Sequence, residues 1–238
     1  RIIGGLEKKN KAIKPSEKKR VAYHEAGHAT ISWLVEHASP LLKVTIVPRG
    51  RSLGAAWYLP EERQLTTTEQ MLDEMCATLG GRAAEQVIFN NISTGALSDL
   101  ESVTKRAQAM VTIYGLSPNI GNISYYDSSG QSEYSFGKPY SEETAKKIDI
   151  EIKGIIETQY DRAVQILTEN KDKLDALASK LLEKEVIFRE DLEEVFGKRA
   201  WDPELTEKPV TNTIPASQQP DEEIIIKDKE EDSEIQAP

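Results

Sequence analysis

The residues with the clearest chemical potential are His24, Glu25 and His28, in the segment His-Glu-Ala-Gly-His. An α-helix turns once in about 3.6 residues, so two histidines four positions apart present their imidazoles on one face. That spacing suits two ligands of one metal ion. Glu25 lies beside them, where a carboxylate can take a proton from a metal-activated water. The pattern indicates a zinc peptidase, with His24 and His28 as ligands and Glu25 as catalytic base.

The alternative interpretation is a pair of ordinary helical histidines on either side of a solvated glutamate. The chain contains only three histidines. Two of them fall at the metal-binding offset around a glutamate, inside a segment with a good helix start. This coincidence favours the metal site over the structural alternative.

A third ligand must come from another part of the chain, because catalytic zinc sites use three protein side chains. His37 lies nine residues after His28, which at about 100° per residue places it on the opposite side of the same helix, and we exclude it. Two carboxylates remain, Glu85 in one predicted helix and Asp99 at the start of the next. Each also has a structural interpretation, as a surface residue or as a favourable first-turn charge. Periodicity alone does not separate them.

Composition limits the class of protein. A chain of 238 residues is long enough for a buried core and predicts one or two domains. The net charge of −10 excludes nucleic acid as the main partner, because a phosphate backbone requires basic surface. Cys76 is the only cysteine, which excludes an internal disulfide and a cysteine-based zinc site. The chain begins at Arg1 without an apolar run of membrane-spanning length, so we expect a soluble fragment of a longer protein.

Capping signals and periodicity predict a mainly α-helical fold with a small β-hairpin or sheet near the histidine segment. The first helix is expected to begin near Pro15 with Ser16 as its N-cap. Ser98 and Glu101 have the spacing of a capping box at the start of a later helix. The predicted helices are 15–37, 66–89, 98–114, 141–169, 172–185 and 189–197, the predicted strands are 42–47 and 53–59, and 115–139 is predicted to be a mobile loop.

Residues 15–201 are predicted to form one domain. Residues 202–238 are rich in Pro and Glu and contain too few apolar residues to fold, so we expect a disordered acidic tail. Within the domain, Gly80-Gly81 predicts close packing of a helix under the site. Cys76 is expected to be a small buried core residue.

Four motifs in this order resemble the peptidase domain of the FtsH family, the membrane-anchored, ATP-dependent zinc proteases of bacteria, mitochondria and chloroplasts. They are HEAGH at 24–28, IVPRG at 46–50, LGGRAAE at 79–85 and STGALSDL at 93–100. The resemblance extends from about residue 1 to residue 201 and does not include the tail. It is far more specific than the zinc-binding segment alone.

The resemblance implies a role for each candidate residue. His24 and His28 match the family's zinc ligands, and Glu25 matches its catalytic base. Asp99 matches the third ligand. Glu85 matches a glutamate that supports the site from behind a ligand, and a ligating histidine commonly has such a partner to fix its orientation. Glu85 as a direct ligand is the alternative.

The family also implies an assembly. We expect a homo-oligomer, a hexamer under a ring of AAA ATPase domains, which cleaves unfolded or misassembled membrane and soluble proteins. Residues 1–14 resemble the end of the ATPase module. The chain has no G-x-x-x-x-G-K-[ST] loop, so ATP and Mg²⁺ are expected to bind elsewhere in the longer protein, as are the transmembrane segments. The expected location is the cytoplasmic face of the bacterial inner membrane, or alternatively the mitochondrial inner membrane. A non-catalytic assembly module is the rival, and it should lack Glu25 or a ligand.

Substrate is expected to add as an extra strand beside the second strand of the hairpin, at Gly54, Ala55, Ala56 and Trp57. This prediction rests on analogy with other zinc peptidases. Pairing through the main chain accepts many sequences, which suits a degradative enzyme. The alternative is a plain hairpin whose apolar residues belong to the core.

Overall fold

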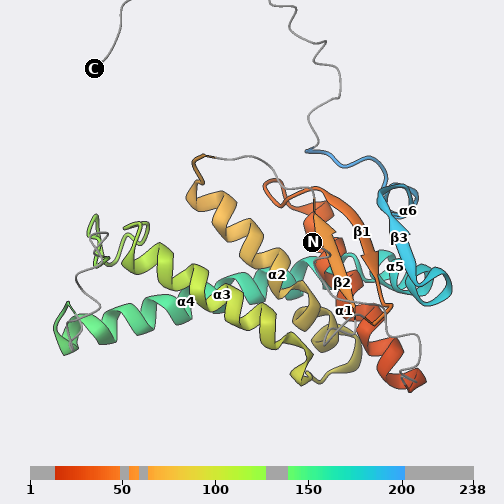
Figure 1. Ribbon diagram of the computed structural model, residues 1–238, viewed down its shortest axis with the longest axis horizontal. Coiled ribbons are helices and arrows are strands. Elements are labelled where there is room, and N and C mark those ends of the chain that lie inside the picture. The colour runs from red at the N-terminus through yellow and green to blue at the C-terminus, as the bar shows by residue number, and fades with distance from the viewer. Residues whose placement is uncertain (1–13, 49–53, 59–63, 127–138, 202–238) are drawn as a thin grey trace, which may run out of the picture. The chain divides into compact units, whose positions relative to one another are not determined.

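The computed structural model describes residues 14–48, 54–58, 64–126 and 139–201, which form α-helices and one small sheet (Figure 1). This confirms the predicted mainly α fold. The predicted tail from 202, the lead-in 1–13 and part of the predicted loop, 127–138, lie outside the described residues. The elements are α1 (Pro15–Leu34), β1 (Leu41–Thr45), β2 (Ala55–Tyr58), α2 (Thr68–Phe89), the 3₁₀ turn η1 (Thr94–Ala96), α3 (Leu97–Thr112), α4 (Glu142–Glu169), α5 (Lys171–Lys184), β3 (Val186–Phe188) and α6 (Arg189–Phe196).

The first helix begins one residue before the predicted cap. Lys14 is extended (φ −61°, ψ 143°) and Pro15 occupies the first helical turn. Ser16 therefore lies inside the helix, and our prediction of Ser16 as the N-cap is wrong. Proline suits the start of a helix because the N–H that it lacks would have no helical partner there.

The first helix ends at Leu34 instead of near His37. Val35 is extended (φ −95°, ψ 149°), and its N–H donates the last helical hydrogen bond, to Ile31. Val35 is 3% exposed, so burial of its side chain turns the chain towards β1. His37 lies beyond the helix, where its N–H donates to Asp73 Oδ2 at 3.0 Å. The helical angle that we used to exclude His37 as a ligand does not apply to it.

Helices α1 and α2 cross closely at two glycines. A Cβ built on Gly27 would overlap the carbonyl oxygen of Gly80 and lie 2.6 Å from the Cβ of Ala84. A Cβ on Gly80 would in turn lie 2.7 Å from the carbonyl oxygen of Gly27. Any side chain at either position would push the two backbones apart. This confirms the close packing expected from Gly80.

Helix α2 contains two internal glycines, each of which disfavours a helix by about 1 kcal/mol. Caps at both of its ends stabilise it. Thr67 and Gln70 form a capping box at the start. Asn90 ends the helix in the left-handed region (φ 50°), a conformation that Asn adopts more readily than most residues. The predicted helix 66–89 is confirmed.

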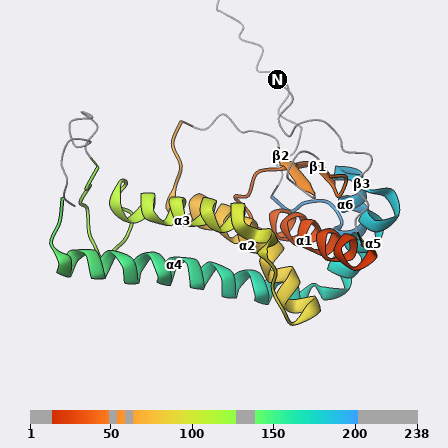
Figure 2. The ribbon, with the colours of Figure 1, turned by 60° about the horizontal axis from the view of Figure 1, so that its bottom comes forward.

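The three strands form an antiparallel sheet in the order β2-β1-β3. Figure 2 shows this sheet over α1, with α4 running below α2 and α3. Thr45 of β1 lies opposite Ala55 of β2 and Val186 of β3. The hairpin is confirmed with shorter strands, whereas β3 was not predicted. A strand of three residues between two helices is too short to show an alternating pattern.

The start of α3 differs from the prediction. The helix begins at Leu97, and Ala96 precedes it without a side-chain cap, so Ser98 and Glu101 do not form the expected capping box. The preceding turn η1 is capped instead, because the Oγ of Ser93 accepts a hydrogen bond from the N–H of Gly95 at 3.2 Å.

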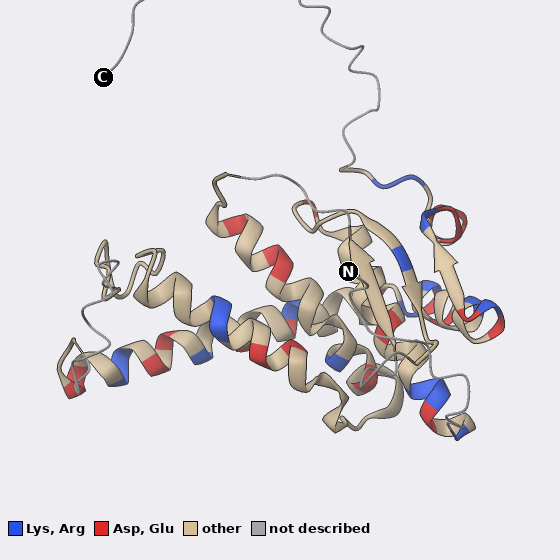
Figure 3. Cartoon of the chain, viewed as in Figure 1, with Lys and Arg blue, Asp and Glu red and all other residues tan. Residues whose placement is uncertain are grey.

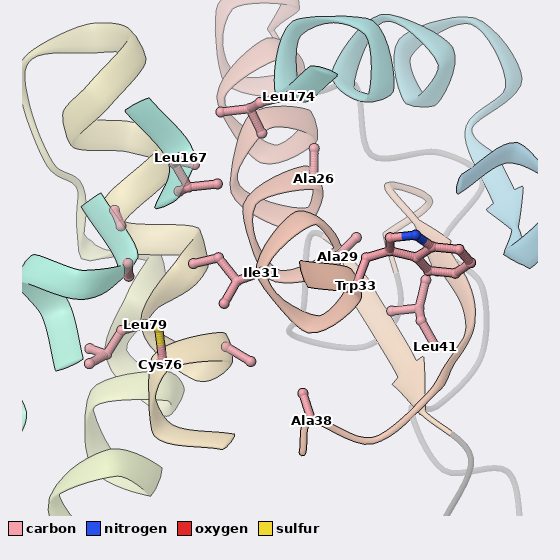
Figure 4. Close-up of a cluster of buried hydrophobic side chains, with 14 of the residues drawn as sticks. Ala26, Ala29, Ile31, Trp33, Ala38, Leu41, Cys76, Leu79, Leu167 and Leu174 are labelled. Carbon is pink, nitrogen blue, oxygen red and sulfur yellow. The ribbon is translucent and has the colours of Figure 1, made fainter. Parts of the chain in front are cut away.

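The core lies between α1 and its neighbours. Figure 4 shows Ile31 of α1 near Cys76 of α2 and Leu167 of α4, and Trp33 near Leu41 of β1. These five side chains are at most 4% exposed. Cys76 is therefore a buried core residue, as predicted, and burial raises the pKa of its thiol to about 12. Removal of this apolar area from water stabilises the arrangement by about 25 cal/mol per Å².

Helix α4, which was predicted over 141–169, is amphipathic. Ser141 caps it by accepting from the N–H of Thr144 at 3.2 Å. Acidic and basic residues are interspersed along its length (Figure 3). The apolar stripe consists of the buried Ile148, Ala163 and Leu167 and the partly buried Ile152, Ile155, Ile156 and Tyr160. Among all the described residues, no helix combines the length and apolar character needed to cross a membrane.

We predict that Gly27→Ala destabilises the protein by at least about 2 kcal/mol, because an added methyl group separates α1 and α2. Gly154→Ala is the matched control: its Cβ meets nothing within 4 Å in α4. Helix propensity should make that variant more stable by up to about 1 kcal/mol. Urea unfolding of both variants measures the difference. Equal stability of Gly27→Ala and the parent protein would contradict the crossing geometry.

Candidate metal centre

Three side chains from two helices meet at one point. The Oδ2 of Asp99, on α3, lies 3.2 Å from the Nε2 of His24 and 3.5 Å from the Nε2 of His28, both on α1. Within the described ranges these three residues form the group that could hold a metal ion, with ligand atoms within 4.8 Å of one another. Ligands about 2.0–2.1 Å from a tetrahedral zinc ion lie roughly 3.4 Å apart. The residues present therefore fit zinc.

The other nitrogen of each imidazole is held from behind. The Nδ1 of His24 lies 3.0 Å from the Oε1 of Glu85, and the Nδ1 of His28 lies 2.9 Å from the carbonyl oxygen of Ala77. With Nδ1 as the donor in both rings, each Nε2 keeps a lone pair directed towards Asp99. The two carboxylates that the sequence left in contention thus occupy different places: Asp99 lies at Nε2, and Glu85 lies behind His24.

Gly81 provides the space in which the imidazoles lie. A Cβ built on this residue would be 2.5 Å from the Nε2 of His28 and 2.6 Å from the Cδ2 of His24. Any side chain at position 81 would therefore overlap the imidazoles of His24 and His28. The second glycine of the Gly80-Gly81 pair is required by the site, whereas the first is required by the helix crossing.

Glu25 is buried against the start of β2. It is 8% exposed, and a Cβ on Gly54 would lie 2.6 Å from its Oε1. Burial is the main cause that raises the pKa of Glu25, and the charge of Asp99 acts in the same direction, while His28 and His24 lower it. A carboxylate with a raised pKa can both accept and return a proton near neutral pH.

The carboxylates around His24 hold its proton tightly when no metal is bound. Burial lowers the pKa of His24, but hydrogen bonds to Asp99 and Glu85, with the charges of Glu25 and Asp99, outweigh burial and raise the pKa to about 9. Burial acts to raise the pKa of Glu85, yet hydrogen bonds from His24, Ser93 and Arg20 lower it to about 2. The pKa of Asp99 is also well below its usual value: burial opposes this shift, and hydrogen bonds to both histidines cause it.

The candidate substrate residues lie along the edge of the sheet next to α1. Gly54 contacts Glu25, and the hydroxyl of Tyr58 accepts from the Oγ of Ser32 at 3.4 Å, so β2 follows α1 past the site. Ala55, Ala56 and Trp57 are half-buried. The Nζ of Lys43 lies 4.7 Å from the centre of the Trp57 ring.

Sequence reasoning missed several residues that support the site. Arg20 and Ser93 donate to the Glu85 carboxylate, at 2.9 Å each, and Arg20 also reaches Asn91. Arg20 lies one helical turn before His24, which is the only sequence signal that could have identified it. The contribution of Ala77 is a backbone carbonyl, which no residue type could reveal.

The metal-free protein is expected to lose stability as pH rises from 6.5 to about 9. The pKa of His24 rises from 6.5 to about 9 on folding, so the folded state binds this proton more tightly than the unfolded chain does. The resulting stabilisation is complete below pH 6.5 and is lost as pH rises through 9. It amounts to about 3 kcal/mol, because each pKa unit corresponds to about 1.4 kcal/mol. Urea unfolding of the chelator-treated protein at several pH values measures it.

Zinc affinity should increase over the same pH range, because the metal binds only the deprotonated imidazole. The variant His24→Gln should abolish the pH dependence of metal-free stability, and His37→Gln should preserve it. Metal-free stability that stays constant between pH 6.5 and 9 would contradict the electrostatics described above.

The chain is similar to a known protein family over most of its length. Residues 11–195 match the model of Peptidase family M41. Over 201 residues the chain is 64% identical to an ATP-dependent zinc metalloprotease FtsH of Parabacteroides distasonis, covering 84% of this chain and 29% of that protein. The protein of the same name from Karelsulcia muelleri is 62% identical over 191 residues, covering 80% of this chain and 31% of that protein.

A mouse relative, mitochondrial inner membrane m-AAA protease component AFG3L2, is 50% identical over 201 residues, covering 84% of this chain and 25% of that protein. The chain thus spans less than a third of the length of each of these three relatives. The matches extend over most of the described residues and confirm the resemblance drawn from the four motifs. The chain belongs to Peptidase family M41.

Proposed function

We propose that this chain is the zinc-dependent endopeptidase domain of an FtsH-type, ATP-dependent protease. The observation that carries the proposal is the convergence of His24, His28 and Asp99, with the buried Glu25 next to them on α1. The names of the two bacterial relatives, which describe zinc metalloproteases, support the metal and the reaction. A non-catalytic assembly module is disfavoured, because all three ligands and the carboxylate are present.

The proposed mechanism assigns one role to each side chain. His24, His28 and Asp99 hold zinc, which when bound supplies Lewis acidity towards a peptide carbonyl and acidifies water. Glu25 accepts the proton of the attacking water and returns it to the leaving amine. Its burial against Gly54 limits the access of bulk water and raises its pKa, so the proton is retained between the two transfers.

We propose that the substrate backbone pairs with β2. Among the described residues, the order β2-β1-β3 leaves β2 with a strand neighbour on one side only. The strand passes Glu25 at Gly54, so a peptide added beside Gly54, Ala55, Ala56 and Trp57 would bring its carbonyl groups close to the catalytic carboxylate. The main chain then supplies the affinity, with little selection for side chains.

The larger assembly is proposed from the relatives. The two bacterial relatives are named ATP-dependent zinc metalloproteases, and the mouse relative is named a component of an m-AAA protease of the mitochondrial inner membrane. We propose that this chain acts in a hexamer on unfolded or misassembled proteins, with ATP and Mg²⁺ bound by an AAA ATPase domain. The higher identity to the two bacterial proteins favours the cytoplasmic face of a bacterial inner membrane over a mitochondrial one.

Removal of a ligand and removal of the base should have different effects. We expect the parent to bind one zinc ion per chain, His28→Ala to lose zinc, and Glu25→Gln to keep zinc while cleavage falls by at least about 100-fold. The third histidine provides a matched control: His37→Ala should keep both zinc and activity. Zinc is measured by elemental analysis, and cleavage by hydrolysis of an unfolded protein with ATP in the full-length enzyme.

The proposal fails if His28→Ala retains zinc at the parental level. It fails equally if Glu25→Gln cleaves at the parental rate. Full activity of the parent after complete removal of zinc would also rule it out.

A proline in β2 should disrupt substrate pairing. Successive strand residues direct their N–H groups to opposite edges, so of Ala55→Pro and Ala56→Pro one removes a donor from the open edge and the other removes one facing β1. We expect the variant that keeps parental thermal stability to lose cleavage of extended peptides by at least about tenfold, with zinc retained. Parental cleavage by that stable variant would refute pairing at β2.

A further inference from the structure

Arg20 connects α1 to two segments that reach the metal centre. It lies one turn before His24, and its side chain is 29% exposed. The Nη1 donates to the Oε2 of Glu85 at 2.9 Å, and the Nη2 donates to the Oδ1 of Asn91 at 2.7 Å. The guanidinium also lies 4.6 Å from the centre of the Phe89 ring. The plane of this side chain is thus fixed by three partners.

The contact with Glu85 acts on the metal centre through His24. Glu85 is 2% exposed. Its Oε1 accepts hydrogen bonds from the Nδ1 of His24 at 3.0 Å and from the Oγ of Ser93 at 2.9 Å. Its Oε2 is held by Arg20. A charge-assisted bond from a planar guanidinium restricts rotation of the carboxylate. Rotation of Glu85 would turn the imidazole of His24 and displace its Nε2.

The contact with Asn91 acts through the chain that leads to Asp99. Asn91 follows the end of α2, and the chain continues through η1 into α3, where Asp99 lies in the first turn. Arg20 holds both the side chain of Asn91 and, at 3.3 Å, its carbonyl oxygen. This loop is anchored to α1 on one side by Arg20 and to Glu85 by Ser93.

We propose that Arg20 is a positioning residue of the metal centre, which orients His24 through Glu85 and Asp99 through the loop at Asn91. It does not touch the ligand atoms. The inference rests on the proposed metal site and adds that Arg20 increases the affinity of this site for zinc. A merely structural role, as an ion pair that joins α1 to the end of α2, would change stability and leave metal affinity unaltered.

The experiment measures zinc affinity by competition with a chromophoric chelator in the full 238-residue chain, at a temperature where every metal-free variant is folded. We expect Arg20→Gln to bind zinc about tenfold more weakly, the lower end of the effect of removing an outer partner of a ligand. Arg20→Lys keeps a positive charge beside Glu85 but cannot also reach Asn91. Its zinc affinity should therefore lie between those of the parent and Arg20→Gln. The ligand-field spectrum of the Co²⁺ form should shift in Arg20→Gln.

Arg162→Gln is the matched control. Arg162 donates to Asp73 Oδ1 at 2.7 Å. This pair resembles the pair of Arg20 and Glu85, because a partly exposed guanidinium binds a buried carboxylate in both. It should change stability and leave zinc affinity and the Co²⁺ spectrum at parental values. Glu85→Gln weakens the route through Glu85 and leaves the route through Asn91, so in this background Arg20→Gln should have a smaller effect on affinity than it has alone.

Three results would overturn the inference: zinc affinity of Arg20→Gln within about twofold of the parent, equal weakening by Arg162→Gln, or full additivity of Arg20→Gln and Glu85→Gln. None of these depends on proteolysis. Failure of the proposed function appears separately, as a parent that binds no zinc or a Glu25→Gln variant that still cleaves.

Discussion

The close approach of α1 and α2 at Gly27 and Gly80 determines the rest of the site. Because no side chain separates the two backbones, α2 comes within hydrogen-bond distance of the histidines on α1. Three positions on successive turns of α2 then serve the site. The carbonyl of Ala77 holds His28, Gly81 leaves space for both rings, and Glu85 holds His24. A wider crossing would leave both Nδ1 atoms without these partners.

Charge balance explains why such a buried site suits a divalent cation. With neutral imidazoles, the three carboxylates of Glu25, Glu85 and Asp99 and the guanidinium of Arg20 carry a net charge of −2. Buried charge without compensation is costly. In the metal-free state a proton on His24 supplies part of the compensation, which is why its pKa rises to about 9. A zinc ion bound by these residues would supply all of it and would take the place of that proton.

The sheet contributes to the site through one glycine and one edge. Gly54 lets β2 lie directly against Glu25, so the strand that buries the proposed catalytic carboxylate is also the strand proposed to pair with a peptide. β3 completes the sheet from the far end of the chain, and the carbonyl of Glu185 accepts from the N–H of Ile46 at 3.0 Å. Residues far apart in sequence therefore stabilise the pair of strands β1 and β2.

The sequence by itself determined whatever depends on neighbours within one or two turns. The helices predicted over 66–89 and 141–169 were found as α2 and α4, and the offset of His24 and His28 placed both imidazoles on one face. Local rules failed where distant contacts prevail. Burial of Val35 ends α1 early, and β3 exists only because β1 offers it an edge.

Periodicity also left Glu85 and Asp99 equivalent, and only resemblance to a known family separated them. They lie 61 and 75 residues from His24, so their positions depend on how α2 and α3 pack against α1. The role proposed for Arg20 depends on the same packing. Its side chain contacts Glu85 and Asn91 only when α2 and the loop at Asn91 are folded against α1.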